Sequence, residues 1–194
     1  MRLPVRPLPP LPAITPHLTL LLLAASGAMA QTRPLRAPDV RYEPSTTIQT
    51  VAMLRLANVT KNDVVYDLGC GDGRLVIMAA KEFGARGVGV DIDPVRIRES
   101  LTNARQAGVE GRVRFRTQDL YDTDIREATV VMLYLWPDMN LKLRPKLWKD
   151  LRVGARVVSN AHGMGDWKPD KHILADGANL YLWYITAALK KATP

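Results

Sequence analysis

Short apolar runs alternate with helical patterns of apolar residues along most of the chain. The runs are rich in β-branched and aromatic side chains, as buried strands are, and they lie at 64–67, 87–91, 113–120, 128–136 and 155–161. Strands that alternate with helices through short joints pair in parallel, with right-handed crossovers. The pattern therefore predicts an α/β protein built on a doubly wound sheet.

Two apolar runs near the C-terminus, 172–177 and 179–187, predict an antiparallel hairpin. This hairpin would complete a sheet of about seven strands that is otherwise mostly parallel. Gly163, Gly165 and Pro169 precede it and oppose helix formation. We therefore expect a loop where a sixth crossover helix would otherwise lie.

Helices are expected beside these strands, at about 46–58, 75–83, 95–107 and 141–151. Thr46 and Gln49 have the spacing of a capping box at the start of the first helix. The apolar pattern places Ile48 on the buried face of that helix and Leu101 on the buried face of the third. Pro145 suits a first helical turn, so the fourth helix is predicted to begin near residue 141.

An acid and three glycines join the first strand to the second helix: Asp67, Gly69, Gly71 and Gly73. A ligand that lies across the carboxyl end of a strand needs the backbone within van der Waals reach, and a Cβ at Gly69 or Gly71 would hold it away. The spacing is D-x-G-x-G-x-G. A dinucleotide-binding loop has G-x-G-x-x-G instead, and its sixth position is occupied here by Arg74.

This spacing resembles the first motif of the class I S-adenosylmethionine-dependent methyltransferases and matches it at every position. Asp91 ends the second strand, where a carboxylate can accept hydrogen bonds from both hydroxyls of a ribose. Asp93 and Pro94 already suit the start of the next helix, so Asp91 is not needed for that role. The third strand ends in Asp119, at the position of the family's adenine-contacting acid. The resemblance implies a Rossmann-like fold with S-adenosylmethionine as its cofactor.

Residues 41–187 resemble a small protein-lysine N-methyltransferase family that has mitochondrial members. The likeness is carried by Tyr42, Pro44 and Ser45, and by KLRPKLWKDLRVGARVVS after the fourth strand. It implies N-methylation of a protein lysine side chain, with Tyr42 beside the cofactor and a helix before the first strand folding over it. The family usually has a hydrophobic residue where this chain has Glu43.

Methyltransferases of this class place the acceptor at the exit of the fourth strand, here residues 134–140. Tyr134, Trp136 and Asp138 are the candidate acceptor contacts. Trp136 could hold an ammonium by a cation–π contact, and Tyr134, Asp138 or water could take the proton that a lysine must lose. We assign no catalytic base.

Two other functions stay open beside a protein-lysine acceptor. One is a methyltransferase for a small molecule, and the other is a non-catalytic nucleoside-binding module of an exported protein. A chain this short lacks an inserted lid domain that would enclose a small molecule, which favours an acceptor side chain exposed on a macromolecule.

Residues 1–30 have the pattern of a secretory signal peptide, with Arg2 and Arg6, an apolar run and small residues before Gln31. Residues 31–44 are interpreted as a linker and 45–190 as the methyltransferase domain. We expect an exported protein with no membrane span after cleavage. An uncleaved anchor, an organellar presequence and a mis-assigned start codon are the alternatives, and the last would leave the domain in the cytoplasm, where S-adenosylmethionine is made.

The chain has 194 residues, enough for one domain with a sizeable core, and a net charge of +8. A basic surface favours acidic partners, but no arginine-rich run with interleaved aromatic residues points to nucleic acid. Cys70 is the single cysteine, which rules out an internal disulfide, and the histidines show no ligand spacing, so no metal site is expected. The sequence does not indicate an oligomeric state.

Overall fold

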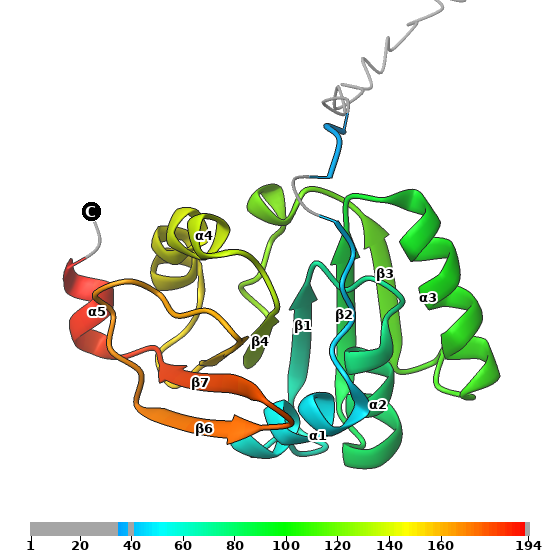
Figure 1. Ribbon diagram of the computed structural model, residues 1–194, viewed down its shortest axis with the longest axis horizontal. Helices are drawn as coiled ribbons and strands as arrows, with labels where there is room; N and C mark the ends of the chain where they lie inside the picture. The colour runs from blue at the N-terminus through cyan, green and yellow to red at the C-terminus, as the bar shows by residue number, and fades with distance from the viewer. Residues whose placement is uncertain (1–34, 39–40, 193–194) are drawn as a thin grey trace, which may run out of the picture. The chain divides into compact units, whose positions relative to one another are not determined.

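The computed structural model describes residues 35–38 and 41–192, all within the compact unit Pro34–Pro194 (Figure 1). The strands are β1 Val64–Leu68, β2 Arg86–Asp91, β3 Val113–Thr117, β4 Val130–Leu133, β5 Arg156–Asn160, β6 Lys171–Ala175 and β7 Ala178–Tyr184. The helices are α1 Thr47–Leu56, α2 Arg74–Phe83, α3 Pro94–Gln106, α4 Pro137–Asp150 and α5 Ala187–Ala192, with a 3-10 turn, η1, at Leu120–Asp122.

The strands of the described chain form one sheet in the order β3-β2-β1-β4-β5-β7-β6. The first five strands in this order are parallel, and β7 runs antiparallel to both β5 and β6. Asp176 and Gly177 both have positive φ between β6 and β7, as a two-residue hairpin turn requires. The predicted doubly wound sheet with a C-terminal antiparallel hairpin is therefore confirmed. Residues 161–170 form a loop without a helix, also as predicted.

Alternate residues of the central strands face two different layers of helices. Val65 and Met132 pack with α1 and α2 on one face, whereas Tyr66 and Leu133 pack with α4 on the other. Strands β1 and β4 are buried along their whole length, as parallel strands covered on both faces are. The carboxyl ends of these strands are therefore where polar groups can gather.

Helix α1 begins with the predicted capping box, but its buried face differs from the prediction. The Thr46 hydroxyl accepts from the Gln49 N–H, and the Gln49 side chain accepts from the Thr46 N–H. Ile48 is 62% exposed, whereas Thr50 and Leu54 are buried. Thr50 tolerates burial because its hydroxyl donates to the Thr46 carbonyl. A search for apolar residues alone therefore misplaces Ile48 and misses Thr50.

Helix α4 begins at Pro137, well before the predicted start near residue 141. Pro137 occupies the first turn, where a backbone N–H has no helical partner to lose. Pro145 lies inside the helix, so its predicted place in the first turn is wrong. A proline there removes one helical hydrogen bond. The turns around it are held by Leu143 and Leu147, which are fully buried against the sheet.

The predicted ends of two strands and the predicted buried face of α3 also differ from the structure. β3 ends at Thr117, and Asp119 caps the 3-10 turn that follows, with its side chain accepting from the Tyr121 N–H. β4 covers only the middle of the predicted 128–136 run. Leu101 is 42% exposed, and Ser100 is buried on α3 instead.

The predicted signal peptide at 1–30 lies outside the described residues. The linker is described only at 35–38 and 41–44, where it forms neither helix nor strand. Within the described part of the chain, no helix is long and apolar enough to cross a membrane. The domain boundaries near residues 30 and 44 therefore stay predictions.

Candidate active site

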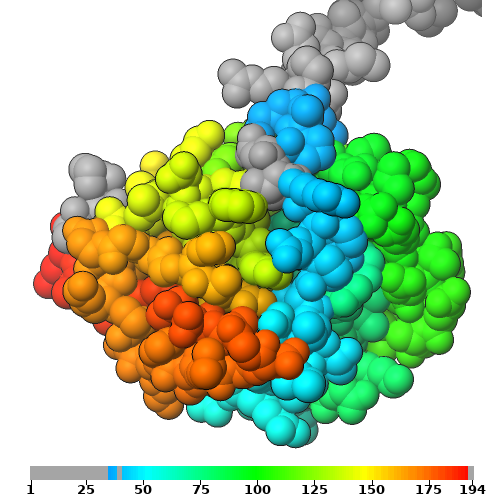
Figure 2. All heavy atoms as spheres, in the orientation of Figure 1, coloured from blue at the N-terminus to red at the C-terminus, as the bar shows by residue number. Residues whose placement is uncertain are grey.

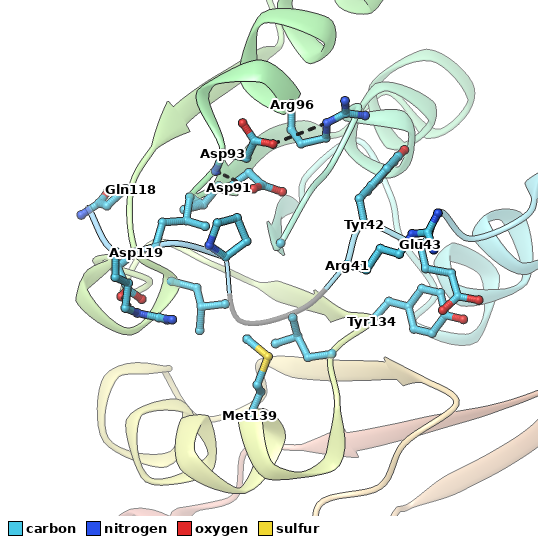
Figure 3. A pocket seen from close by; sticks show the side chains of 17 residues that line it. Arg41, Tyr42, Glu43, Asp91, Asp93, Arg96, Gln118, Asp119, Tyr134 and Met139 are labelled. Carbon is cyan, nitrogen blue, oxygen red and sulfur yellow. Dashed lines mark hydrogen bonds and ion pairs between the residues drawn. The ribbon is translucent and has the colours of Figure 1, made fainter. Parts of the chain in front are cut away.

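Two adjoining cavities lie at the carboxyl ends of the central strands. The first is lined by residues from distant parts of the chain, among them Arg36, Tyr42, Asp91, Asp119 and Tyr134 (Figure 3). The second lies on the other side of Gly69 and is lined by Asp67, Cys70 and Asp72. In Figure 2 the described residues before α1 lie across this face, between the α3 and α4 sides.

The glycines of the loop after β1 are required by backbone conformation and by close packing. Gly69, Gly71 and Gly73 all have positive φ, which residues with a Cβ rarely adopt. A Cβ at Gly71 would overlap the ring of Tyr42, and one at Gly73 would lie 2.7 Å from Phe115. The predicted reason was access for a ligand. The described neighbours supply a further reason, because protein side chains already fill the space over Gly71 and Gly73.

Two side chains of α3 hold this loop from behind. The buried Ser100 hydroxyl donates to the Gly71 carbonyl at 2.8 Å, and the Asn103 amide donates to the Asp72 carbonyl at 2.9 Å. Sequence reasoning did not single out either residue. The available signal was a small polar residue at a helical position that should face the core, which indicates a buried hydrogen bond.

Asp91 lies at the end of β2 and fastens the loop while facing the first cavity. Its Oδ2 accepts from the Gly71 N–H and its Oδ1 from the Asp93 N–H, both at 2.9 Å. Each carboxylate oxygen keeps a further lone pair for a ligand hydroxyl. Asp93 caps α3 by accepting from the Val95 N–H, as predicted. Asp91 is therefore positioned to accept hydrogen bonds from ribose hydroxyls in the first cavity.

Asp67 is a buried carboxylate without a hydrogen-bond or ion-pair partner among the described residues. Burial, followed by the charges of Asp91 and Asp72, raises the pKa of Asp67 to about 7. Burial and the same acidic surroundings hold the pKa of the Cys70 thiol well above its usual value. Cys70 therefore stays protonated and serves as a small buried side chain. Asp67 lacks the cation that a buried carboxylate normally pairs with.

Asp119 lies at the far end of the first cavity, beside the described part of the linker. Its Oδ1 accepts from the Tyr121 N–H at 3.0 Å, and its Oδ2 accepts from Arg36 Nε at 2.8 Å. Burial alone would raise the pKa of Asp119, but the hydrogen bond from Arg36 brings it below the usual value. The acid is therefore ionised, and Arg36 lines the cavity next to it.

Tyr42 lies across the glycine loop and lines both cavities (Figure 3). Its ring packs on Gly71, and the guanidinium carbon of Arg96 is 4.7 Å from the ring centroid. Burial and the charge of Asp72 raise the pKa of the Tyr42 hydroxyl. The neutral ring therefore forms part of the cavity wall.

Residues 41–45, which we call the lead-in segment, are anchored at their C-terminal end. Arg74 Nη1 donates to the Ser45 carbonyl at 2.8 Å, and the Asn160 amide donates to the Ser45 hydroxyl at 3.1 Å. Asp72 binds the same arginine through both carboxylate oxygens. Sequence reasoning missed the roles of Arg74 and Asn160, because both depend on contacts between distant parts of the chain.

The three predicted acceptor contacts are not brought together. Tyr134 lines both cavities, and burial, then the charge of Glu43, raises the pKa of its phenol. Trp136 is 58% exposed and stacks on His162 with ring centroids 6.1 Å apart. Asp138 is exposed in the first turn of α4. Neither Trp136 nor Asp138 lines the described cavities.

This arrangement suits a nucleoside joined to an amino acid. The first cavity offers the Asp91 carboxylate to ribose hydroxyls, and the second ends at Asp67, whose unpaired carboxylate suits an amine. The loop between them has its backbone close to both. Within the described residues, no group of three or more His, Cys, Asp or Glu side chains is placed to hold a metal ion.

Comparison with known proteins gives consistent matches to one kind of enzyme. The ANTKMT methyltransferase domain family matches residues 67–171. The chain is 42% identical over 153 residues to a protein-lysine N-methyltransferase of Saccharolobus islandicus (strain REY15A), which covers 76% of this chain and 95% of that protein. It is 34% identical over 137 residues to the adenine nucleotide translocase lysine N-methyltransferase of Mus musculus, covering 70% of this chain and 58% of that protein.

A solved structure is similar over the same region. It is described as an RNA methyltransferase from Salinibacter ruber in complex with S-adenosyl-L-homocysteine. The two chains are 48% identical with a TM-score of 0.74, and the match covers 75% of this chain and 95% of that one. The similar proteins share a reaction class and differ in the acceptor that their names give.

Proposed function

The chain belongs to the ANTKMT methyltransferase family of class I S-adenosylmethionine-dependent enzymes, and we propose that it methylates the side-chain amine of a protein lysine. The reaction class, the cofactor and the Rossmann-like fold follow from family membership. The acceptor is our proposal. It is carried by the 42% identity over 95% of an archaeal protein-lysine N-methyltransferase.

The cofactor contacts in this proposal follow the chemistry of the two cavities. Asp91 accepts the ribose hydroxyls and Asp119 contacts the adenine from the far end of the first cavity. Asp67 pairs with the amine of the amino-acid end, which supplies the cation that the carboxylate otherwise lacks. The backbone of Gly69, Gly71 and Gly73, with Tyr42 over it, forms the wall along which the ligand lies.

The bound cofactor supplies a methyl group that its sulfonium already activates. The lysine nitrogen bonds to the methyl carbon as the carbon–sulfur bond breaks, and the bonding pair stays on sulfur. Alignment at ~3 to 3.5 Å makes this step effectively unimolecular, so positioning is the protein's main contribution. The lysine must first lose a proton, which passes to water. The raised pKa keeps the Tyr134 phenol protonated near neutral pH, so Tyr134 acts as a neutral wall of the opening.

The name of the Salinibacter ruber structure makes RNA the acceptor that the experiment must separate from lysine. The chain is basic, with a net charge of +8, and this charge attracts polyanions such as RNA. The charge near Tyr134 has the opposite sign, because Glu43 and Asp67 share the second cavity with it. We therefore favour a cationic acceptor.

The test incubates the purified chain with extract from cells that lack it and with cofactor labelled on its methyl group. We expect label on protein, mapped by mass spectrometry to lysine side chains, and much less label when the Asp91→Ala variant replaces the wild type. Label on RNA, lipid or metabolites with none on protein would refute the lysine acceptor and leave the methyltransferase assignment intact. Binding of S-adenosylhomocysteine without label on any class would favour the non-catalytic alternative.

A further inference from the structure

Glu43 lies where the two cavities meet. The residues that line both cavities are Tyr42, Glu43, Gly69 and Tyr134. S-adenosylmethionine joins a nucleoside to an amino acid through its sulfur. Asp91 suits the ribose of this ligand and Asp67 suits its amine. The methyl-bearing sulfur therefore belongs between them, where the two cavities meet. Figure 3 shows the Glu43 side chain extending beside the Tyr134 ring at this junction.

The backbone of Glu43 is fixed on both sides, while its side chain is not engaged. On one side Tyr42 packs on Gly71 and under Arg96. On the other side Ser45 is held by hydrogen bonds from Arg74 and Asn160. The Glu43 carboxylate is exposed and has no hydrogen-bond or ion-pair partner among the described residues. A carboxylate on a fixed backbone with a free side chain is placed to receive a ligand.

The charges around the second cavity favour a cation at Glu43. Three carboxylates line it, those of Glu43, Asp67 and Asp72, against a single guanidinium, that of Arg74. Arg74 donates hydrogen bonds to both carboxylate oxygens of Asp72, so these charges offset each other. Asp67 is buried at the inner end, where the amine of the cofactor belongs. Of the three carboxylates, Glu43 is then the one that remains for a cation at the opening. The exposed Arg41 lines the first cavity and not the second.

We propose that Glu43 determines specificity for a cationic acceptor by binding the ammonium form of the incoming lysine beside Tyr134. The inference rests on the proposed lysine acceptor and adds the residue that recognises it. An ammonium approaching a sulfonium meets like-charge repulsion, and a carboxylate at the opening offsets it. The neutral Tyr134 phenol packs against the apolar stem of the lysine and leaves the charge to Glu43.

This role has a consequence for pH dependence, because Glu43 stabilises the form of lysine that must still lose its proton. An opposite charge nearby raises the pKa of an amine. The pH profile of kcat reports the pKa values of groups in the enzyme–substrate complex. The rise of kcat with pH should therefore be shifted to higher pH in the wild type than in Glu43→Gln. The other charged groups that line the two cavities are the same in both proteins: Arg36, Arg41, Arg74, Arg96, Asp67, Asp72, Asp91, Asp93 and Asp119. The difference between the two profiles thus isolates Glu43.

The binding test uses the peptide mapped in the labelling experiment, made with lysine and with its neutral isostere norleucine. Each is titrated by calorimetry into the full chain saturated with S-adenosylhomocysteine. We expect the wild type to favour lysine over norleucine and Glu43→Gln to lose about five- to tenfold of that preference. Glu43→Asp should retain part of it. Glu82→Gln, which removes the same charge from an exposed site on α2, should behave as wild type.

The kinetic test should show a KM for the lysine peptide raised about five- to tenfold in Glu43→Gln, with kcat at high pH close to wild type. Equal lysine preference in wild type and Glu43→Gln would overturn the inference and leave the lysine acceptor standing. A loss of S-adenosylmethionine affinity greater than that of S-adenosylhomocysteine would also overturn it, because Glu43 would then serve the sulfonium. Absence of lysine label from the wild type would refute the proposed function, and the inference with it.

Discussion

The Asp67 carboxylate is buried beside two other acids, and this makes the free protein sensitive to pH. Its pKa is about 7 in the folded chain against an ordinary value of 3.8. Between these values the folded chain holds a proton that the unfolded chain has released. The stability associated with Asp67 is therefore full below about pH 4 and is lost as pH rises toward 7.

Asp67→Asn should remove this loss, because an amide is neutral at every pH. The unfolding free energy of Asp67→Asn minus that of wild type is the quantity to compare. It should be about 2 to 3 kcal/mol larger at pH 8 than at pH 5. The buried amide costs the same at both pH values and cancels in this comparison. Urea unfolding of the ligand-free proteins at the two pH values measures the difference. A stability difference independent of pH would show that Asp67 is ionised over the whole range.

The same residue should make cofactor binding pH-dependent. An amine pairs with the carboxylate and not with the carboxylic acid, so affinity for S-adenosylhomocysteine should fall as pH drops below about 7. Asp67→Asn should bind more weakly and without this dependence. Calorimetry from pH 5.5 to 8 in the two proteins tests it. Parallel pH profiles would place the cofactor's amine elsewhere.

Asp91→Asn tests the ribose contact with little disturbance of the loop, since the amide oxygen can still accept from the Gly71 N–H. Loss of hydrogen bonds to a charged acceptor costs ~1.5 to 3 kcal/mol, so affinity for S-adenosylhomocysteine should fall on the order of tenfold to a hundredfold. Asp124→Asn changes one exposed acid away from the cavities and should bind normally. A folded Asp91→Asn variant with wild-type affinity would mean that the ribose is held by other groups.

Single acids at strand ends were predictable because topology alone brings them to one edge of the sheet. Asp67 and Asp91 are such cases, and each lines a cavity. Trp136 and Asp138 follow the same strand as Tyr134, yet they lie outside the cavities because helix α4 starts directly after Trp136. Which way a side chain points after a strand depends on where the next helix begins, and sequence did not indicate that for α4.

At the scale of elements, the glycine loop is held in place by helix α3. Ser100 is fully buried, and its hydroxyl donates to the Gly71 carbonyl as well as to the Arg96 carbonyl one turn earlier. The Cys70 thiol is the other donor to the Gly71 carbonyl, at 3.8 Å, and a thiol is a weak donor, so loss of the Ser100 hydroxyl should let this carbonyl shift or take up water. The precision of the cofactor wall therefore depends on a residue that is itself buried behind the loop.

Ser100→Ala should weaken S-adenosylhomocysteine binding several-fold and lower stability by about 1 kcal/mol. Thr102→Ala is the matched control, since Thr102 lies on the exposed side of α3 and its hydroxyl bonds only within the helix region, to Arg98 and Arg105. The control should leave cofactor affinity unchanged. Calorimetry and urea unfolding of both variants measure the two effects. Equal affinities in the two variants would show that the loop keeps its shape without α3.

Element types were predictable here, and element faces and boundaries less so. The capping box of α1 is a local signal, and it was confirmed. The buried face of α1 includes Thr50, which hydrophobicity alone does not reveal. Pro145 inside α4 is tolerated because tertiary packing of the leucines beside it outweighs one lost hydrogen bond. Local rules therefore fail where burial supplies the deciding energy.

At the scale of the whole molecule, the fold was predictable because alternating strands and helices leave few topologies open. The site was predictable as far as the D-x-G-x-G-x-G loop and the strand-end acids. Glu43 was noted only for its difference from the family. The contacts of Arg74, Asn160 and Ser100 were not identified, because they join the lead-in segment to α2 and β5 and the glycine loop to α3. Contacts between segments so far apart in the chain have no signature in a single sequence.

The N-terminal 30 residues raise the last question, which concerns the compartment in which the enzyme works. Arg2, Arg6, the apolar run and the small residues before Gln31 lead us to propose export, although the cofactor is made in the cytoplasm. Cell fractionation should find a mature chain that begins near Gln31 outside the cytoplasm. Replacing the leucines of the run with polar residues should retain the full-length chain inside. Amino-terminal sequencing of the natural protein decides between the alternatives. A cytoplasmic chain that keeps residues 1–30, or one that starts at an internal methionine ahead of an intact domain, would refute export. It would also remove the conflict with the cofactor's place of synthesis.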